Sequence, residues 1–145
     1  MSLRWLAYLI LAWAIFLIVG CGGQPGPRKV AMEFIEAVYA SDSTAILKYV
    51  DFEQVARERM GHLPEEEQLK NLDQMKQQLY RSLLMNGPVR AKWNSYRIVV
   101  ANETVQGDSA WVDVTFMRKE TGATRYTKMV LRRKEGSWKI ASYVE

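Results

Sequence analysis

Residues 109–140, SAWVDVTFMRKETGATRYTKMVLRRKEGSWKI, decide the fold of this chain. Side chains alternate in character from residue 109 to 117, and neighbouring side chains of a β-strand point to opposite faces of its sheet. The predicted core face carries Ala110, Val112, Val114 and Phe116. The opposite face carries Trp111, Asp113, Thr115 and Met117. The pattern therefore predicts a strand with one buried face.

Three short turn sequences divide the C-terminal half of the chain. They are VQGD, ETGA and KEGS, and glycine within such a short segment is typical of a hairpin connection. The sequence thus predicts an antiparallel meander of four strands. Their approximate ranges are 92–104, 109–119, 123–134 and 138–144.

The N-terminal half has helical periodicity instead. Apolar residues recur at three- and four-residue spacing from Pro27 to about Ala40, and Asp42 or Ser43 offers an N-cap for a second, short helix. Asp51 offers a further cap, and Pro64 with three following glutamates is typical of the first turn of a helix. That last helix is expected to end at the Asn-Gly-Pro sequence of residues 86–88. Helices followed by a one-sided antiparallel sheet predict an α+β domain, in which the helices cover the sheet's apolar face.

Two motifs carry a resemblance to a known family. The first helix carries FIEAVYASD and the strand meander ends in EGSWKI, and this order of elements resembles the nuclear transport factor 2-like fold over residues 27–145. The chain is especially similar to small bacterial lipoproteins of unassigned function that carry this domain. The resemblance implies a cone-shaped half-barrel, a curved four-stranded antiparallel sheet wrapped around the first helix. The domain is expected to span residues 28–145.

The first 21 residues have the outline of an export signal. Arg4 is followed by an uncharged run from Trp5 to Val19, which is long for a signal core and short for a membrane span of roughly 20 residues. A retained signal-anchor helix is the alternative to cleavage. The sequence Ile-Val-Gly-Cys at residues 18–21 resembles the bacterial lipobox, which implies cleavage between Gly20 and Cys21 and lipidation of Cys21 with fatty acids such as palmitate.

The resulting organisation is a signal peptide at residues 1–20, a lipidated cysteine with a tether at 21–27, and the domain. Two or three acyl chains hold a small domain durably on a membrane, since each buried methylene contributes about 0.8 kcal/mol. The sequence therefore predicts a lipid-anchored protein of the bacterial cell envelope. Gly22 stands where an aspartate would favour retention in the inner membrane. By resemblance, this favours the outer membrane, facing the periplasm, in a Gram-negative host.

Chemistry-bearing residues are sparse. One histidine, His62, and one cysteine cannot supply a usual metal set, and no phosphate-binding loop or nucleophile elbow is present, so no metal or cofactor is expected. Isomerase relatives of the fold use a carboxylate base inside the cone, for which Asp113 would be the candidate. Asp113 shares the face of Trp111 and Met117, so we expect it to point out of the cone and expect no catalytic residue.

Aromatic side chains are the better candidates for binding. A pocket inside the cone would be lined by Tyr39, Trp93, Tyr96, Phe116, Tyr126 and Tyr143, although aromatic residues at such spacing more often form a core. Trp111 and Met117 on the outer face predict a covered surface, either in a homodimer or against an envelope protein. Residues 88–145 carry 11 basic and 6 acidic side chains. We favour a solvated sheet face as the explanation, with a surface for phosphates, anionic lipids or an acidic partner as the alternative, and an anchor outside the cytoplasm argues against a nucleic-acid partner.

Together these observations predict a non-catalytic module that binds a small ligand or a protein. The alternative is an isomerase- or dehydratase-type enzyme that uses the pocket of the cone. A filled interior would favour an interaction surface, whereas an open, polar interior would favour a ligand or a substrate.

Overall fold

The computed structural model describes residues 23–145. The predicted signal peptide, its cleavage site after Gly20 and the lipidation site Cys21 lie outside the described residues. Within residues 23–145, no helix combines the length and the apolar character that crossing a bilayer requires.

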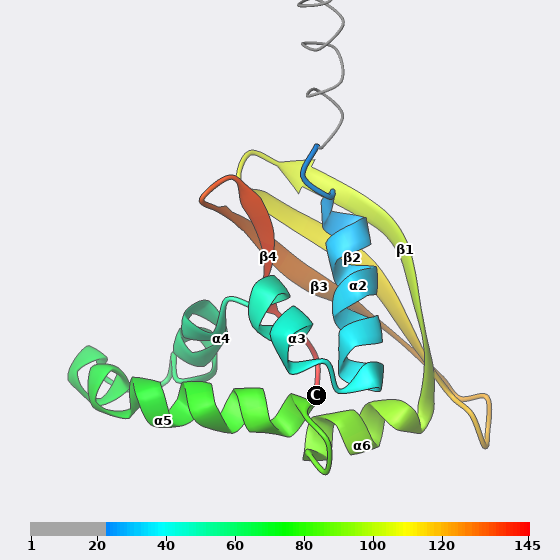
Figure 1. Ribbon diagram of the computed structural model, residues 1–145, viewed down its shortest axis with the longest axis horizontal. Coiled ribbons are helices and arrows are strands. Elements are labelled where there is room, and N and C mark those ends of the chain that lie inside the picture. The colour runs from blue at the N-terminus through cyan, green and yellow to red at the C-terminus, as the bar shows by residue number, and fades with distance from the viewer. Residues whose placement is uncertain (1–22) are drawn as a thin grey trace, which may run out of the picture.

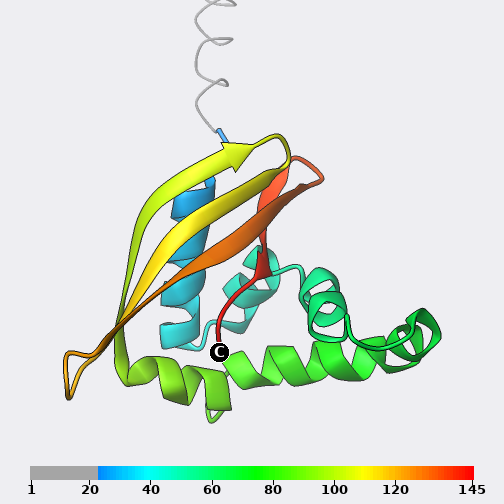
Figure 2. The same cartoon turned by 180° about the vertical axis from the view of Figure 1, so that it is seen from behind.

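The described part of the chain is an α+β domain, as predicted. Four strands form one antiparallel sheet in the order β1-β2-β3-β4, and α2 lies across one face of it (Figures 1 and 2). The strands are β1 (Tyr96–Gln106), β2 (Ser109–Arg118), β3 (Thr124–Lys134) and β4 (Ser137–Ser142). Register shifts between Val100 and Glu103 and between Val130 and Leu131 interrupt the ladders. Such irregularities bend and twist strands, and the sheet is visibly curved.

The core lies between α2 (Pro27–Ala40) and the inner face of the sheet. On β2 the predicted face is buried: the exposed fraction of Ala110, Val112, Val114 and Phe116 does not exceed 5%. From α2, Val30, Phe34 and Val38 meet this face at helical spacing, each at most 1% exposed. Pro27 opens the helix at a position where a missing N–H costs nothing.

Two short helices follow the aspartates predicted as caps. Asp42 accepts a hydrogen bond from the backbone N–H of Ala45 and begins α3 (Ser43–Tyr49). Asp51 does the same for Gln54 and begins α4 (Phe52–Arg59). Between these helices, Val50 forms a parallel bridge with Ile140, so the chain covers the outer edge of β4 at this point.

The long helix α5 (Glu65–Leu83) runs along the end of the domain opposite to the N-terminal end of α2 (Figure 1). Its C-terminal half is held by Leu79 and Leu83, which are at most 4% exposed. Leu69 is 56% exposed, because the N-terminal half of α5 extends beyond the sheet.

A helix that the sequence analysis did not predict follows α5. Residues 92–94 were assigned to the first strand, and that assignment is wrong: they end α6 (Pro88–Asn94), and β1 begins only at Tyr96. Pro88 is suited to a first helical position, and Val89 and Trp93 lie one turn apart and are both buried. The burial of Val89 and Trp93 on one side of this segment stabilises it as a helix.

Candidate functional site

The interior of the domain is filled with aromatic rings. Trp93 lies at the centre: its ring centroid is 5.6 Å from that of Phe34, 5.8 Å from that of Phe116 and 6.1 Å from that of Tyr143. The interplanar angles are 66–85°, which are edge-to-face arrangements typical of packed cores. Three of the predicted pocket residues, Trp93, Phe116 and Tyr143, are thus at most 5% exposed and contribute to the core.

Two further predicted pocket residues border this cluster. Tyr39 is half-buried, and its hydroxyl donates a hydrogen bond to the carbonyl oxygen of Tyr96 at 3.0 Å. Burial raises the pKa of Tyr39, so it stays a neutral donor. The Tyr96 hydroxyl accepts a hydrogen bond from Arg118 at 3.0 Å, and the Arg118 guanidinium lies 5.3 Å from the centroid of the Tyr96 ring. Tyr39 therefore joins α2 to α6 and to β1, and Tyr96 joins β1 to β2.

Tyr126, the sixth predicted pocket residue, does not belong to this group. It is 80% exposed, and its register with Thr115 places it on the outer face of the sheet. Strand β3 buries Met129 and Leu131, and side chains an odd number of positions from them point the other way.

Tyr143 carries an unpaired polar atom. Its hydroxyl is buried and makes no hydrogen bond of good geometry with a described residue; burial raises the pKa of this hydroxyl, and the nearby Ser82 hydroxyl acts in the opposite direction. The backbone carbonyl of Tyr143, in contrast, accepts a hydrogen bond from Arg59 at 2.8 Å. Without a hydrogen bond, this hydroxyl adds no stability to the packed cluster beyond that of the phenyl ring.

The carboxylate considered for catalysis lies outside the cluster, as expected. Asp113 is on the outer face of β2, and its Oδ1 is 2.6 Å from Lys128 Nζ. His62 is exposed in the loop before α5. No group of three or more His, Cys, Asp or Glu side chains in residues 23–145 is arranged to hold a metal ion.

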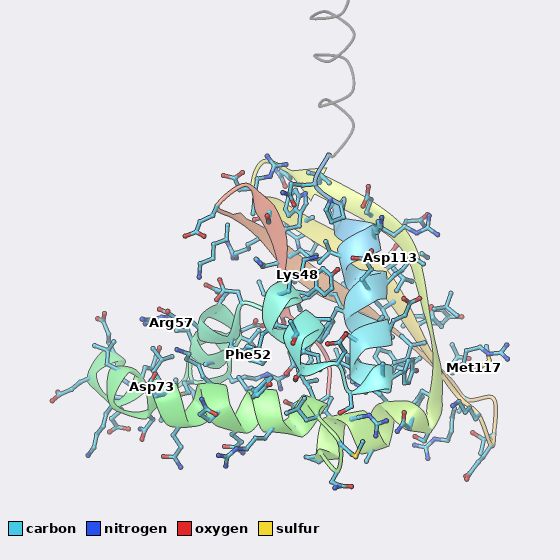
Figure 3. All side chains as sticks on the ribbon, in the orientation of Figure 1. Lys48, Phe52, Arg57, Asp73, Asp113 and Met117 are labelled. Atoms are coloured by element: carbon cyan, nitrogen blue, oxygen red, sulfur yellow. The ribbon has the colours of Figure 1, made fainter. Side chains whose placement is uncertain are left out.

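The outer face of the sheet presents a group of apolar side chains, all exposed except the half-buried Trp111, which we call the outer patch: Val99, Trp111, Met117 and Tyr126. Val99 and Tyr126 both pair with Thr115 and so lie in one row across three strands. Met117 is 38% exposed in the neighbouring part of β2, near the β2–β3 turn at the margin of the molecule (Figure 3). Trp111 is half-buried and lies beside a small cleft of about 290 Å³ between α4 and the sheet, which Glu58 and Arg132 also line.

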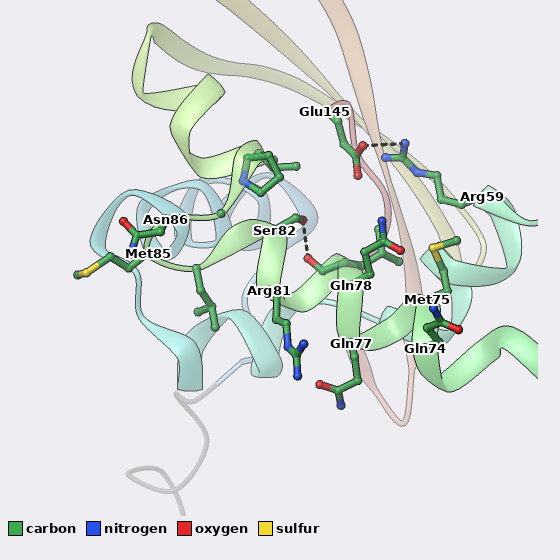
Figure 4. A pocket seen from close by; sticks show the side chains of 15 residues that line it. Arg59, Gln74, Met75, Gln77, Gln78, Arg81, Ser82, Met85, Asn86 and Glu145 are labelled. Carbon is green, nitrogen blue, oxygen red and sulfur yellow. Dashed lines mark hydrogen bonds and ion pairs between the residues drawn. The ribbon is translucent and has the colours of Figure 1, made fainter.

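A larger hollow, of about 1030 Å³, lies beside α5 and α6, at the end of the domain opposite to the N-terminal end of α2. We call it the α5–α6 hollow. It is bounded by the C-terminal half of α5, the loop of residues 84–87 and the start of α6. Arg59 and Glu145 close one side, with Arg59 Nη1 3.6 Å from Glu145 Oε2 (Figure 4).

Sequence reasoning missed the α5–α6 hollow. Its polar lining comes mainly from Gln74, Gln77, Gln78 and Arg81, which share a face of α5. The spacing of these polar residues was visible in DQMKQQLYRS at residues 73–82. Their neighbours Arg59 and Glu145, however, come together only through the tertiary fold.

Comparisons with known proteins identify no family for this chain. No protein-family model and no curated protein matches it. Among solved structures, it is similar to a crystal structure described as "Putative NTF2-like transpeptidase" from Campylobacter jejuni, with 18% sequence identity and a TM-score of 0.46. That similarity covers 80% of this chain and 97% of the other.

Proposed function

We propose that this chain is a lipid-anchored protein of the bacterial cell envelope whose domain acts as a non-catalytic protein-interaction module. The observation that carries the proposal is the contrast between the two sides of the sheet. The inner side is closed by the cluster of Trp93, Phe34, Phe116 and Tyr143, whereas the outer side exposes the outer patch. Exposed apolar groups on a sheet favour a surface that a partner covers.

We infer that the domain is nuclear transport factor 2-like, with the sheet curved around its first helix. Support comes from the order of elements, helices followed by a four-stranded meander, and from α2 lying along the inner face of the sheet. Trp138 of the EGSWKI motif is 7% exposed and packs in the core.

We propose a second copy of this chain as the occupant of the outer patch. A two-fold interface brings the same surface of each copy together, so that surface must be complementary to itself. The outer face meets this requirement, because Asp113 and Lys128 lie side by side among the apolar residues. When two copies face each other across a two-fold axis, Asp113 of one copy can pair with Lys128 of the other. Another envelope protein is the alternative occupant.

Figure 1 supports an orientation for the anchored domain. The N-terminal end of α2 lies where the β1–β2 and β3–β4 turns are found, and α5 and α6 lie at the opposite end. A lipid on Cys21 would therefore hold the α5–α6 hollow away from the membrane.

Mass spectrometry of the protein purified from membranes tests the anchor. We expect a mature chain that begins at Cys21 and carries the mass of a diacylglyceryl group with an additional acyl chain. An intact Met1 with an unmodified Cys21 would contradict it.

Sedimentation of the soluble domain, residues 23–145, tests the pairing. We expect a concentration-dependent dimer that Tyr126→Lys together with Met117→Lys dissociates. The control is Arg125→Lys, a conservative change next to Tyr126. A monomer at every concentration would overturn pairing and favour an envelope protein as the partner.

A further inference from the structure

The side chains that line the α5–α6 hollow are unusual in their chemistry. Gln77, Gln78 and Arg81 lie three, four and seven residues after Gln74, so the four side chains form one stripe along α5. The amides of Gln74, Gln77 and Gln78 form no hydrogen bond with any residue in the range 23–145. Each therefore offers one acceptor and one two-hydrogen donor group to a ligand.

Apolar groups flank this amide stripe on both sides. Met75 lies on the side of Arg59, and Met85 lies at the end formed by the α5–α6 loop (Figure 4). Met85 is 67% exposed. Methionine is flexible and polarisable and adapts to apolar groups of different shapes. The hollow thus offers hydrogen bonding along its floor and adaptable apolar contacts at its sides.

The charges around the hollow nearly cancel. Arg59 forms an ion pair with Glu145, which leaves Arg81 as the lining cation that pairs with no described residue. A lining with one free positive charge does not match a polyphosphate or a nucleic acid, which need several cations. It matches a ligand whose only charge is a single carboxylate.

The dimensions of the stripe match a short extended chain. Gln74 and Arg81 are seven residues apart, which is about 10 Å along a helix at roughly 1.5 Å per residue. An extended peptide advances about 3.3 Å per residue, so roughly three residues span the stripe, and the loop at Met85 and Asn86 extends this to about five. Along that length a peptide presents alternating N–H and C=O groups, the partners that glutamine amides require.

We propose that the α5–α6 hollow binds an extended polypeptide segment of another protein, about three to five residues long. The glutamine amides hydrogen-bond its backbone, Met75 and Met85 contact an apolar side chain, and Arg81 pairs with a carboxylate side chain. This site is separate from the outer patch and goes beyond the proposed function.

A random heptapeptide library displayed on phage is the probe, with the purified domain of residues 23–145 immobilised. We expect enriched peptides to contain an apolar residue and an acidic residue at a fixed spacing. Synthetic forms of these peptides then give dissociation constants by calorimetry. Failure to enrich any common pattern overturns the proposal.

Two variants locate the binding. Gln74→Ala/Gln77→Ala/Gln78→Ala should weaken the selected peptides at least about tenfold, because each lost hydrogen bond contributes to affinity. Alanine is the best helix former, so α5 stays folded. Gln106→Ala, at the exposed β1–β2 turn, is the matched control and should leave affinity unchanged. Equal affinity for the triple variant and the wild-type domain overturns the proposal.

Arg81→Glu provides a readout that a general loss of structure would not produce. The library selection should change from acidic to basic peptides, since the mouth of the hollow then carries a negative charge. An unchanged preference overturns the role of Arg81.

Two further measurements distinguish peptide binding in the hollow from binding at the outer patch and from binding of a saccharide. Tyr126→Lys, which tests the outer patch, should leave peptide binding intact. A peptide affinity that Tyr126→Lys abolishes would place the binding on the outer patch and overturn the hollow as its site. Tight binding of an N-acetylglucosamine oligomer in the hollow, with no peptide enriched, would overturn the assignment to a polypeptide.

Discussion

The carboxylate of Glu103, on β1, accepts a hydrogen bond at 2.7 Å from the backbone N–H of Arg28 at the start of α2. The N-cap residue of this helix is Gly26, which has no side chain that could accept a hydrogen bond from the first turn. Glu103 therefore satisfies an unpaired N–H from the sheet and places a negative charge at the positive end of the helix dipole. The contact joins the first helix to the edge strand, next to the interruption of the β1–β2 register after Val100.

Replacing this distant cap should destabilise the domain. Glu103→Ala is expected to lower the free energy of unfolding by about 1 kcal/mol, the usual effect of losing an N-cap. Glu120→Ala, in the exposed β2–β3 turn, is the control and should have no effect. Urea denaturation of the two variants measures the difference. Equal stability of both would show that the 2.7 Å contact contributes nothing.

The two tryptophans at 93 and 111 should respond very differently to truncation. Trp93 is 1% exposed at the centre of the aromatic cluster, so Trp93→Ala is expected to cost about 3–5 kcal/mol through lost burial and the cavity it leaves. Trp111 is half-buried on the outer face, and Trp111→Ala should cost the monomeric domain roughly 1 kcal/mol. Denaturation at low protein concentration separates the two. Similar losses would argue against a filled interior.

Replacing Tyr143 or Tyr39 by phenylalanine should change the stability of the domain differently. Tyr143→Phe removes a hydroxyl that has no described partner, so stability should stay the same or rise. Tyr39→Phe breaks the hydrogen bond to the Tyr96 carbonyl and should cost about 1 kcal/mol. Thermal unfolding followed by circular dichroism compares them. A loss for Tyr143→Phe as large as for Tyr39→Phe would reveal a partner for the Tyr143 hydroxyl.

The hydroxyl of Tyr49 donates a hydrogen bond to the carboxylate of Glu33, and this contact raises the pKa of Tyr49 to about 12 from its ordinary value of 10.0. Because the folded state holds the proton more tightly, the stabilising effect is complete below pH 10 and is lost as the pH rises toward 12. Glu33→Gln should return the pKa of Tyr49 toward 10. The tyrosinate absorbance of each protein, compared with its Tyr49→Phe form, measures this shift. An identical titration of Tyr49 in both would remove Glu33 as the cause.

The sequence alone was sufficient to predict the strands and most of the helices, since their signals are local. Alternation along β2 identifies its buried face, and Asp42 and Asp51 identify the starts of α3 and α4. The helix α6 has only Val89 and Trp93 as anchors, too few for a periodic signal, and its end resembled the start of a strand.

Side-chain placement was harder to predict where it depends on pairing between segments. Tyr126 was assigned to the interior because its face depends on the register with Thr115, which one sequence does not fix. The α5–α6 hollow depends on contacts between distant segments, such as the pair of Arg59 and Glu145. The sequence shows the glutamines of α5, but it does not show that a hollow lies beside them.

Gly87, in the loop that bounds this hollow, supplies the last prediction. A Cβ atom at Gly87 would lie 2.2 Å from the backbone oxygen of Ser82, so Gly87→Ala forces the loop away from α5 at a cost of roughly 3 kcal/mol. The matched control is Gly107→Ala, where φ is 59° and no atom lies within 4 Å, and the cost is the backbone strain of about 1 kcal/mol. Chemical denaturation should rank the two in this order. Because the displaced loop also moves Met85 and Asn86, Gly87→Ala should weaken peptides selected on the α5–α6 hollow, whereas Gly107→Ala should not. If both alanines cost the same and peptide affinity is unchanged, the close packing of the loop on α5 does not shape the hollow.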